Sequence, residues 1–99
     1  MKENIEYSQH IIRSCRKILR NGRRITKTSD MQMLNMSVSI LYKQKQYMRE
    51  DIERFYEIML KEEDDDAKDV YADILLQFGK LHYDIDVLID QQMKILLDE

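Results

Sequence analysis

The strongest constraint on the fold is a run of apolar residues that recur alternately every three and four positions. The pattern appears in two long segments of the chain and holds a single polar member in each. The first segment carries Met31, Leu34, Val38, Leu41, Lys45, Met48, Ile52, Phe55 and Met59, and the second carries Tyr71, Ile74, Phe78, Leu81, Ile85, Leu88, Gln92 and Ile95. This heptad spacing is typical of helices that pack along a seam, so we predict helices over about residues 30–62 and 67–97.

Five consecutive acids at positions 62–66 separate the two segments, and the heptad phase breaks there. A turn at this point folds the second segment back antiparallel to the first. Seam residues then pair where their numbers sum to 129 or 130, from Met59 opposite Tyr71 to Leu34 opposite Ile95. Because every seam residue from Leu34 to Met59 finds a seam partner, local pattern and global pairing agree. A domain-swapped dimer would use the same contacts between chains, and the sequence leaves that alternative open.

Helix boundaries are predicted from capping residues. Ser29 with Gln32 fits a capping box at the start of the second helix, and Asp66 suits the N-cap of the third. Near the N-terminus, apolar residues recur every seven positions at Ile5, Ile12 and Leu19 and predict a helix over about residues 4–21. The dipeptide at 21–22, Asn-Gly, is expected to end it, because glycine tolerates the left-handed conformation that closes many helices.

This first helix is predicted to cover a second apolar stripe that flanks the seam. The stripe contains Met33, Ile40, Tyr47, Leu75, His82, Ile89 and Leu96. With about 18 residues, the helix should reach only halfway along the hairpin, which leaves the half near the acidic turn as two helices.

Composition supports an all-α fold. The 99 residues hold no proline, only two glycines, and 35% charged residues, which favours helix over sheet. We therefore predict one domain, residues 1–99, folded as a three-helix bundle made of a long antiparallel hairpin and a shorter N-terminal helix. The single cysteine excludes an intrachain disulfide or a thiolate metal cluster and suits a reducing cytoplasm. No segment has the signature of a signal peptide or a membrane span, so no membrane partner is expected.

The uncovered half of the hairpin is rich in aromatic residues, and we interpret it as a partner-binding surface. The predicted partner-binding residues are Tyr47, Phe55, Tyr56, Tyr71 and Leu75. Exposed grooves between two helices commonly receive another helix, and tyrosine is frequent at such interfaces. The alternative is that these side chains simply form the core of the hairpin.

A basic stripe is the second candidate. Residues 1–30 carry a net charge of +5, from eight cations and three acids, whereas residues 31–99 carry −8, from eight cations and sixteen acids. The stripe consists of Arg13, Arg16, Lys17, Arg20, Arg23, Arg24 and Lys27, with no acid among them. It suits the phosphates of a nucleic acid or an acidic groove on a partner protein. Alternatively, it is a solvated face that pairs with acids of the other two helices.

Catalytic and metal-binding patterns are weak. The two histidines fit no di-iron, zinc-protease or phosphate-loop motif, and His82 with Asp86 makes one i,i+4 pair, too few ligands for a metal site. Cys15 lies on the apolar face of the first helix without a nearby base. Lys45, which can reach Asp84 or Asp86, and Gln92 are interpreted as polar positions that fix the register of the hairpin.

These features predict a small cytoplasmic protein that is not an enzyme and needs no cofactor or metal. The expected function is protein–protein interaction, as an adaptor, inhibitor or chaperone-like regulatory protein that acts through the hairpin surface and forms a homodimer. The alternative is a nucleic-acid-associated regulator that uses the basic N-terminal helix.

Overall fold

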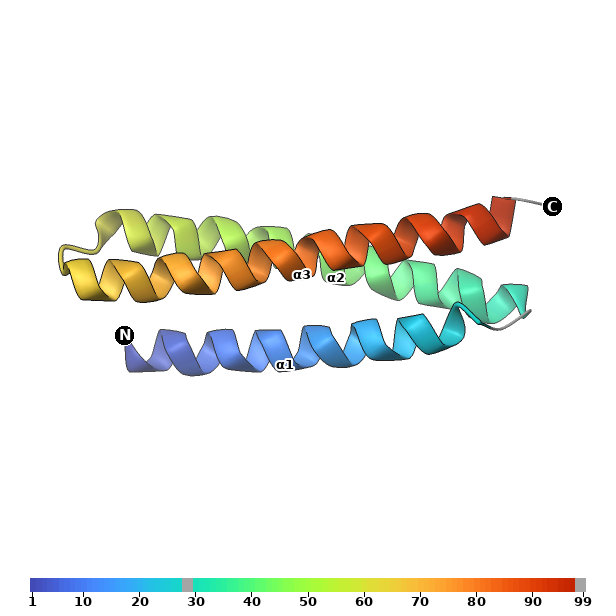
Figure 1. Ribbon diagram of the computed structural model, residues 1–99, viewed down its shortest axis with the longest axis horizontal. Helices are drawn as coiled ribbons and strands as arrows, with labels where there is room; N and C mark the ends of the chain where they lie inside the picture. The colour runs from blue at the N-terminus through green and yellow to red at the C-terminus, as the bar shows by residue number, and fades with distance from the viewer. Residues whose placement is uncertain (28–29, 98–99) are drawn as a thin grey trace.

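The computed structural model describes residues 1–27 and 30–97 and contains three helices. They are α1 (Lys2–Ile25), α2 (Met31–Lys61) and α3 (Asp65–Leu97). α2 and α3 form an antiparallel hairpin, and α1 lies along it, so the body is elongated, 54 × 19 × 15 Å (Figure 1). The predicted all-α, three-helix bundle is confirmed. Over the described residues, none of these helices has the length and apolar character needed to cross a membrane.

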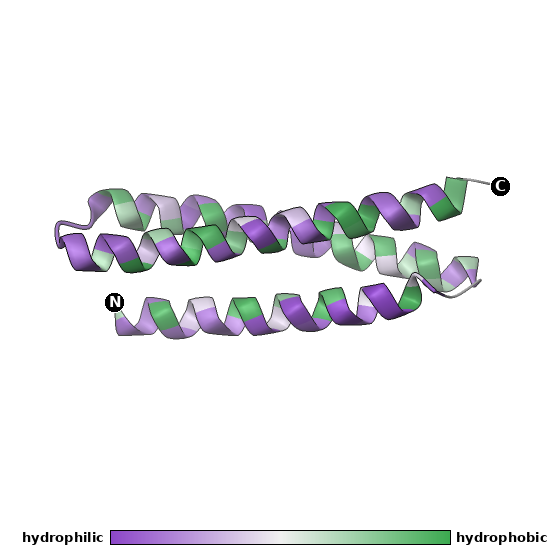
Figure 2. Ribbon diagram, in the orientation of Figure 1, coloured by the Kyte–Doolittle hydropathy of each residue, from purple (hydrophilic) through white to green (hydrophobic). Residues whose placement is uncertain are grey.

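The predicted seam forms the contact between α2 and α3. Most of its members are buried, and apolar positions recur along all three helices between hydrophilic ones (Figure 2). The ring of Phe55 lies 5.2 Å from that of Phe78 and 6.2 Å from that of Tyr71, centroid to centroid. Phe55 is therefore level with Ile74, the partner that the register predicts.

Both polar seam residues make the kind of contact expected of register-fixing positions. Lys45 Nζ lies 2.6 Å from Asp86 Oδ1, which confirms the predicted reach of the lysine. Gln92 is fully buried and its Nε2 donates to the carbonyl oxygen of Gly22 at 2.9 Å. The first pair joins α2 to α3, and the second joins α3 to α1.

Aspartates cap α2 and α3, although not the residues expected. Asp30 accepts hydrogen bonds from the backbone N–H groups of Gln32 and Met33 at 3.0 and 3.3 Å, and the predicted cap Ser29 lies outside the described residues.

At the start of α3, Asp64 occupies the capping position that was predicted for Asp66. Its carboxylate accepts from the N–H of Asp66 at 3.4 Å, and its carbonyl accepts from the N–H of Lys68 at 3.0 Å. Because α3 begins at Asp65, Asp66 falls in the first turn, where its negative charge suits the helix dipole.

The predicted end of the first helix at Gly22 is wrong, because α1 continues to Ile25. Gly22 is buried inside the helix, and no described glycine has a positive φ. A Cβ atom at this position would lie 2.8 Å from Leu88 Cδ2 and 3.7 Å from Leu41 Cδ2. Glycine is therefore needed for the close packing of α1 on the hairpin and not for a turn.

The expectation that the first helix covers only half of the hairpin is also wrong. Asn4 Nδ2 donates to the hydroxyl of Tyr71 at 3.1 Å, and Gly22 is bonded to Gln92. These two contacts place α1 beside α3 from Tyr71 to Gln92. Asn4 and Gly22 bracket the predicted helix of residues 4–21, so the error lay mainly in the expected reach of this helix along the hairpin and less in its length, although α1 has 24 residues.

The second apolar stripe is not covered as expected. Ile40 is half exposed and lines a shallow groove with Ile18 and Ile25 at the edge of α1. Leu75, its supposed neighbour on the same side, lies in a groove between α2 and α3 that contains no residue of α1. Ile40 and Leu75 therefore lie in different grooves, of which only the first borders α1, while Ile89 of the same stripe is buried in the core.

The close packing at Gly22 gives a test of the fold. Leucine is a much better helix former than glycine, by about 0.8 kcal/mol, so Gly22→Leu should stabilise α1 unless packing forbids it. We expect a net loss of about 2 kcal/mol or more in the free energy of unfolding, because leucine must displace Leu88. Urea unfolding followed by circular dichroism measures the change.

Gly79→Ala is the matched control. Gly79 also lies inside a helix, but nothing comes within 4 Å of a Cβ built on it. This substitution should stabilise the dilute protein by up to about 1 kcal/mol. Equal stabilisation by both substitutions would contradict the close approach of Leu88 to α1.

Candidate functional site

Two of the five predicted partner-binding residues belong to the core. Phe55 and Tyr71 are only 1% and 2% exposed. α1 covers both, since the ring of Tyr7 stacks on Phe55 at 6.3 Å and Asn4 donates to the hydroxyl of Tyr71. Asn4 and Tyr7 lie within the predicted helix of residues 4–21, so the error was its expected reach along the hairpin, and α1 makes both residues inaccessible to a partner.

Tyr56 and Leu75, by contrast, line an apolar groove between α2 and α3. The groove has a volume of about 460 Å³ and is lined by Ile52, Tyr56, Met59, Ala72, Leu75, Leu76 and Gly79. No charged side chain lines it. Leu76 is 74% exposed, and Tyr83, one heptad beyond it on α3, is 67% exposed. Two large apolar side chains therefore project into solvent: Leu76, which lines the groove, and Tyr83, one heptad further along α3.

No contact within the described residues explains why position 79, in this groove, holds a glycine. Glycine in a helix interior costs about 1 kcal/mol relative to alanine, and no atom comes near enough to exclude a Cβ. Sequence reasoning identified Tyr56 and Leu75 but missed Leu76, Gly79 and Tyr83. Their signal was present as a second run of four- and three-residue steps on the outer face of α3, beginning at Ala72.

Tyr47, the fifth predicted residue, lies elsewhere. It is about half exposed and continues the stripe that begins with Met33, Met36 and Ile40 on α2. Ile40 lies at the edge of α1. Tyr47, one heptad further along, therefore belongs to a different surface from Tyr56.

The seven cations of the basic stripe are all exposed, as predicted. Within the described residues, no ion pair joins any of them to an acid; the four salt bridges there involve Lys45, Arg54, His82 and Lys94. The interpretation that the stripe pairs with acids of the other two helices is therefore wrong. The side chains leave their charge available to an external anion.

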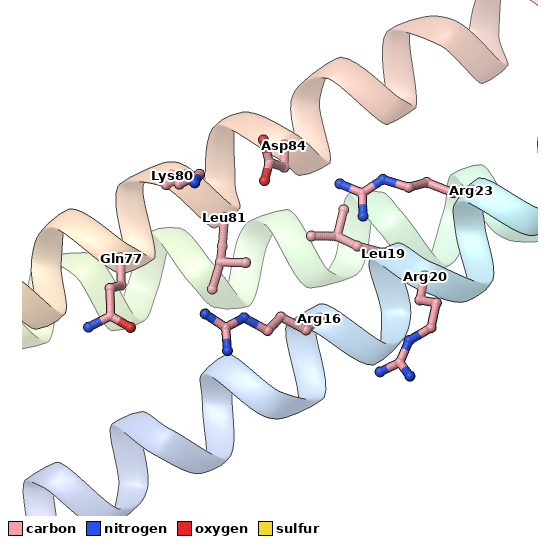
Figure 3. A pocket seen from close by; sticks show the side chains of 8 residues that line it. All are labelled: Arg16, Leu19, Arg20, Arg23, Gln77, Lys80, Leu81 and Asp84. Carbon is pink, nitrogen blue, oxygen red and sulfur yellow. The ribbon is translucent and has the colours of Figure 1, made fainter.

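Three of these cations line a groove between α1 and α3, where Arg16 and Arg23 extend into the space between the two helices and Arg20 extends away from α3 (Figure 3). Its volume is about 590 Å³, and Arg16, Arg20 and Arg23 line it together with Lys80 of α3. Gln77, Asp84, Leu19 and Leu81 complete the lining. Four cations thus surround one groove against a single acid.

Polar contacts hold α1 in place at both ends of the hairpin. Near the acidic turn, the hydroxyl of Tyr7 donates to Asp51 Oδ1 at 3.2 Å, and Arg54 lies 4.5 Å above the ring of Tyr7 and 2.8 Å from the same carboxylate oxygen. Burial raises the pKa of Asp51, while Tyr7 and Arg54 oppose that rise.

At the other end, Gln92 Nε2 donates to Thr26 Oγ1 as well as to Gly22, each at 2.9 Å. Thr26 in turn donates its hydroxyl to the Gly22 carbonyl at 2.9 Å. The Gly22 carbonyl also accepts from the backbone N–H of Thr26 at 3.0 Å, so three donors meet at this one oxygen at the end of α1.

The remaining candidates for chemistry have structural surroundings. Cys15 is fully buried, and burial raises the pKa of its thiol to about 11, with Asp84 adding to the rise and Arg16 opposing it. His82 Nδ1 lies 3.8 Å from Asp86, whose other oxygen contacts Lys45. In the part of the chain that the structure describes, no three His, Cys, Asp or Glu side chains are grouped to hold a metal ion.

Comparison with protein-family models, with curated proteins and with solved structures finds no match to this chain. The fold and the two surfaces therefore define the protein as a three-helix bundle with an apolar groove on the hairpin and a basic groove beside α1.

The surroundings of Cys15 predict slow reaction with thiol reagents. With its pKa at about 11 instead of 9.0, the thiolate is about a hundredfold scarcer at pH 8 in the folded protein than in the unfolded chain. Native labelling by iodoacetamide should be at least that much slower than labelling in urea, as mass spectrometry can measure.

The same shift predicts how stability depends on pH. The folded state holds the thiol proton more tightly than the unfolded chain does. The protonated thiol therefore stabilises the fold fully below pH 9, and this stabilisation is lost as the pH rises toward 11. Cys15→Ala should reduce this loss of stability.

In the labelling experiment, fast reaction of the native protein at pH 8 would contradict the burial of the thiol.

Proposed function

We propose that this protein is a non-enzymatic interaction factor that self-associates through the apolar groove between α2 and α3. The observation that carries the proposal is the exposure of Leu76 and Tyr83 beside that groove. A role as an adaptor, inhibitor or chaperone-like regulator follows from such a module. A cytoplasmic setting belongs to the same proposal, because the one cysteine is a buried free thiol.

The outer face of α3 carries a short seam of its own. Ala72, Leu76, Gly79 and Tyr83 recur at steps of four, three and four residues, the spacing of helices that pack along a heptad. α1 does not cover this face, and the groove beside it is lined by α2 and α3 alone. A helix from outside the chain is the natural complement to such a seam.

A second copy of α3 fits it when the two helices run antiparallel and cross at Gly79. Leu76 and Tyr83 lie three residues before and four after Gly79, so Tyr83 of the second copy is level with Leu76. That side chain then faces the groove formed by Tyr56, Ala72 and Leu75. The arrangement is two-fold symmetric, and each copy supplies both the projecting side chain and the groove.

This dimer would explain why residue 79 is a glycine. At the crossing point the two glycines face one another, and the absence of Cβ atoms lets the helix backbones approach closely. The helix propensity lost at Gly79 is then offset by contacts that exist only between copies.

Charge complementarity supports the same pairing. Lys68 and Asp90 lie eleven residues before and after Gly79, so each faces the other in the antiparallel dimer. Lys68 makes no ion pair among the described residues, and Asp90 contacts only the exposed Lys94, at 3.1 Å. Such rim pairs add little affinity, but they fix orientation.

The expected affinity is moderate. Burying an exposed Leu or Tyr side chain contributes roughly 1.5–3 kcal/mol, and each copy supplies one of each. Association costs several kcal/mol in lost freedom. We therefore expect a dissociation constant on the order of 1–100 μM.

Analytical ultracentrifugation across that concentration range tests the dimer. Leu76→Asp should shift the protein to monomer, because a carboxylate would be buried against an apolar groove. Met36→Asp is the matched control: Met36 is similarly exposed, at 61%, but lies on α2 in the stripe that contains Ile40. This control should leave the dimer intact.

A charge exchange tests the register. Lys68→Asp and Asp90→Lys should each weaken association by a few-fold, and the two together in one chain should restore it. A protein that stays monomeric at several hundred micromolar would rule out self-association. A dimer lost with Met36→Asp but not with Leu76→Asp would place the interface on the other face and contradict the proposed groove.

A further inference from the structure

The basic surface of α1 is independent of the apolar groove and calls for a different ligand. Six cations, Arg13, Arg16, Lys17, Arg20, Arg23 and Arg24, lie within α1, and Lys27 follows just beyond its end. All are exposed, and none is neutralised by an acid of the described residues. A surface of this kind attracts a linear anion, because no ion pair within the described residues takes up its charge.

We propose that this surface binds the phosphodiester backbone of a nucleic-acid duplex without reading its sequence. The six cations from Arg13 to Arg24 extend over eleven helical steps, about 17 Å at 1.5 Å per residue. That is about one positive charge per 3 Å, against one phosphate per 3.4 Å along each strand of a duplex. The charge density of the helix thus matches that of a single strand.

Arginine accounts for five of these six cations. Its planar guanidinium donates two parallel hydrogen bonds to a phosphate, and it keeps its charge in every surrounding. An acidic protein segment also suits arginine, but a nucleic-acid strand repeats its charge every 3.4 Å without interruption. The uninterrupted row therefore favours phosphodiesters over carboxylates.

The groove between α1 and α3 gives the contact its shape. Arg16 and Arg23 of α1 extend into the space between the helices, and Lys80 lies on the α3 side (Figure 3), so a strand seated there is contacted from both helices. No aromatic residue lines this groove. Stacking on unpaired bases, on which single-strand binding depends, is therefore not provided.

The acids of the chain limit the strength of binding. Asp84 lies in the groove, and the whole protein carries a net charge of −3. We expect about four phosphate contacts, hence a slope of about −3 to −4 in log K against log salt. A dissociation constant on the order of 100 μM at 150 mM NaCl should then tighten about 50-fold at 50 mM.

Fluorescence anisotropy of a labelled, mixed-sequence 20-base-pair DNA duplex, titrated with the full chain, measures this binding. The triple variant Arg16→Glu, Arg20→Glu and Arg23→Glu should weaken it by at least about 30-fold and flatten the salt slope. The matched control reverses three exposed cations of α2, as Lys43→Glu, Arg49→Glu and Lys61→Glu. Its net charge changes equally, but its loss should stay below about fivefold.

A second variant keeps the test valid if the reversed arginines disturb folding. Arg16→Lys, Arg20→Lys and Arg23→Lys preserve the charge, so duplex binding should persist within a few-fold. Circular dichroism confirms the helix content of each variant. Because these substitutions avoid the groove of Leu76, sedimentation should show an unchanged dimer, which separates this proposal from the proposed self-association.

Three outcomes would overturn the proposal. The first is no duplex binding at 20 mM NaCl, and the second is an equal loss in the α2 control. The third is tighter binding to another anion: poly-glutamate of equal charge would indicate an acidic protein partner, and vesicles with 30% phosphatidylserine would assign the phosphodiester contact to lipid headgroups.

Discussion

The register of the α2–α3 seam is the constraint on which the rest of the structure depends. Phe55 is fixed between Tyr71 and Phe78, and Lys45 reaches Asp86 at 2.6 Å. Slipping this hairpin by one heptad would break both contacts and carry the aromatic residues away from Tyr7. It is also this register that brings Tyr56 beside Leu75 and so creates the apolar groove. The surface therefore follows from the same pairing as the core.

α1 is held on this hairpin by close steric packing at one end and by hydrogen bonds at both ends. At Gly22, the helix approaches Leu88 so closely that an added Cβ would force the leucine side chain to move, and the same residue's carbonyl accepts from Gln92 and Thr26. Gly22 and the buried amide of Gln92 thus act at the same point. The glycine sets how closely α1 approaches α3, and the amide fixes the position of α1 along the hairpin axis. Because α1 is held this way, its cationic face points outward and borders Lys80.

Features that follow from the spacing of apolar residues could be predicted from the sequence. Features that depend on the spatial neighbours of a single side chain could not. The heptad pattern was enough for the hairpin, its register and the exposure of the basic stripe. Gly22 was misread as a stop because Asn-Gly is a common helix end. Yet Ser8, Cys15 and Gly22 lie seven residues apart on the buried face of α1, and that phase was the available signal that the helix continues. A separate error exposed Phe55 and Tyr71 in the prediction: the helix was expected to reach only halfway, although Tyr7 and Asn4, which cover them, were already within it. No pattern could show that the arginines lack acidic partners, because that depends on distances between helices.

The two proposed surfaces share α3, so a dimer formed through one surface would also set the arrangement of the other. Leu76, Gly79 and Tyr83 serve the apolar side, while Gln77, Lys80 and Asp84 serve the basic side. These residues interleave along two turns of one helix but point in different directions, so one surface does not obstruct the other. A two-fold dimer through Gly79 would carry two basic grooves related by the same axis. A duplex long enough to reach both would gain the second set of contacts at high effective concentration. Weak phosphate contacts of a single copy would then become strong only where the protein is concentrated enough to pair.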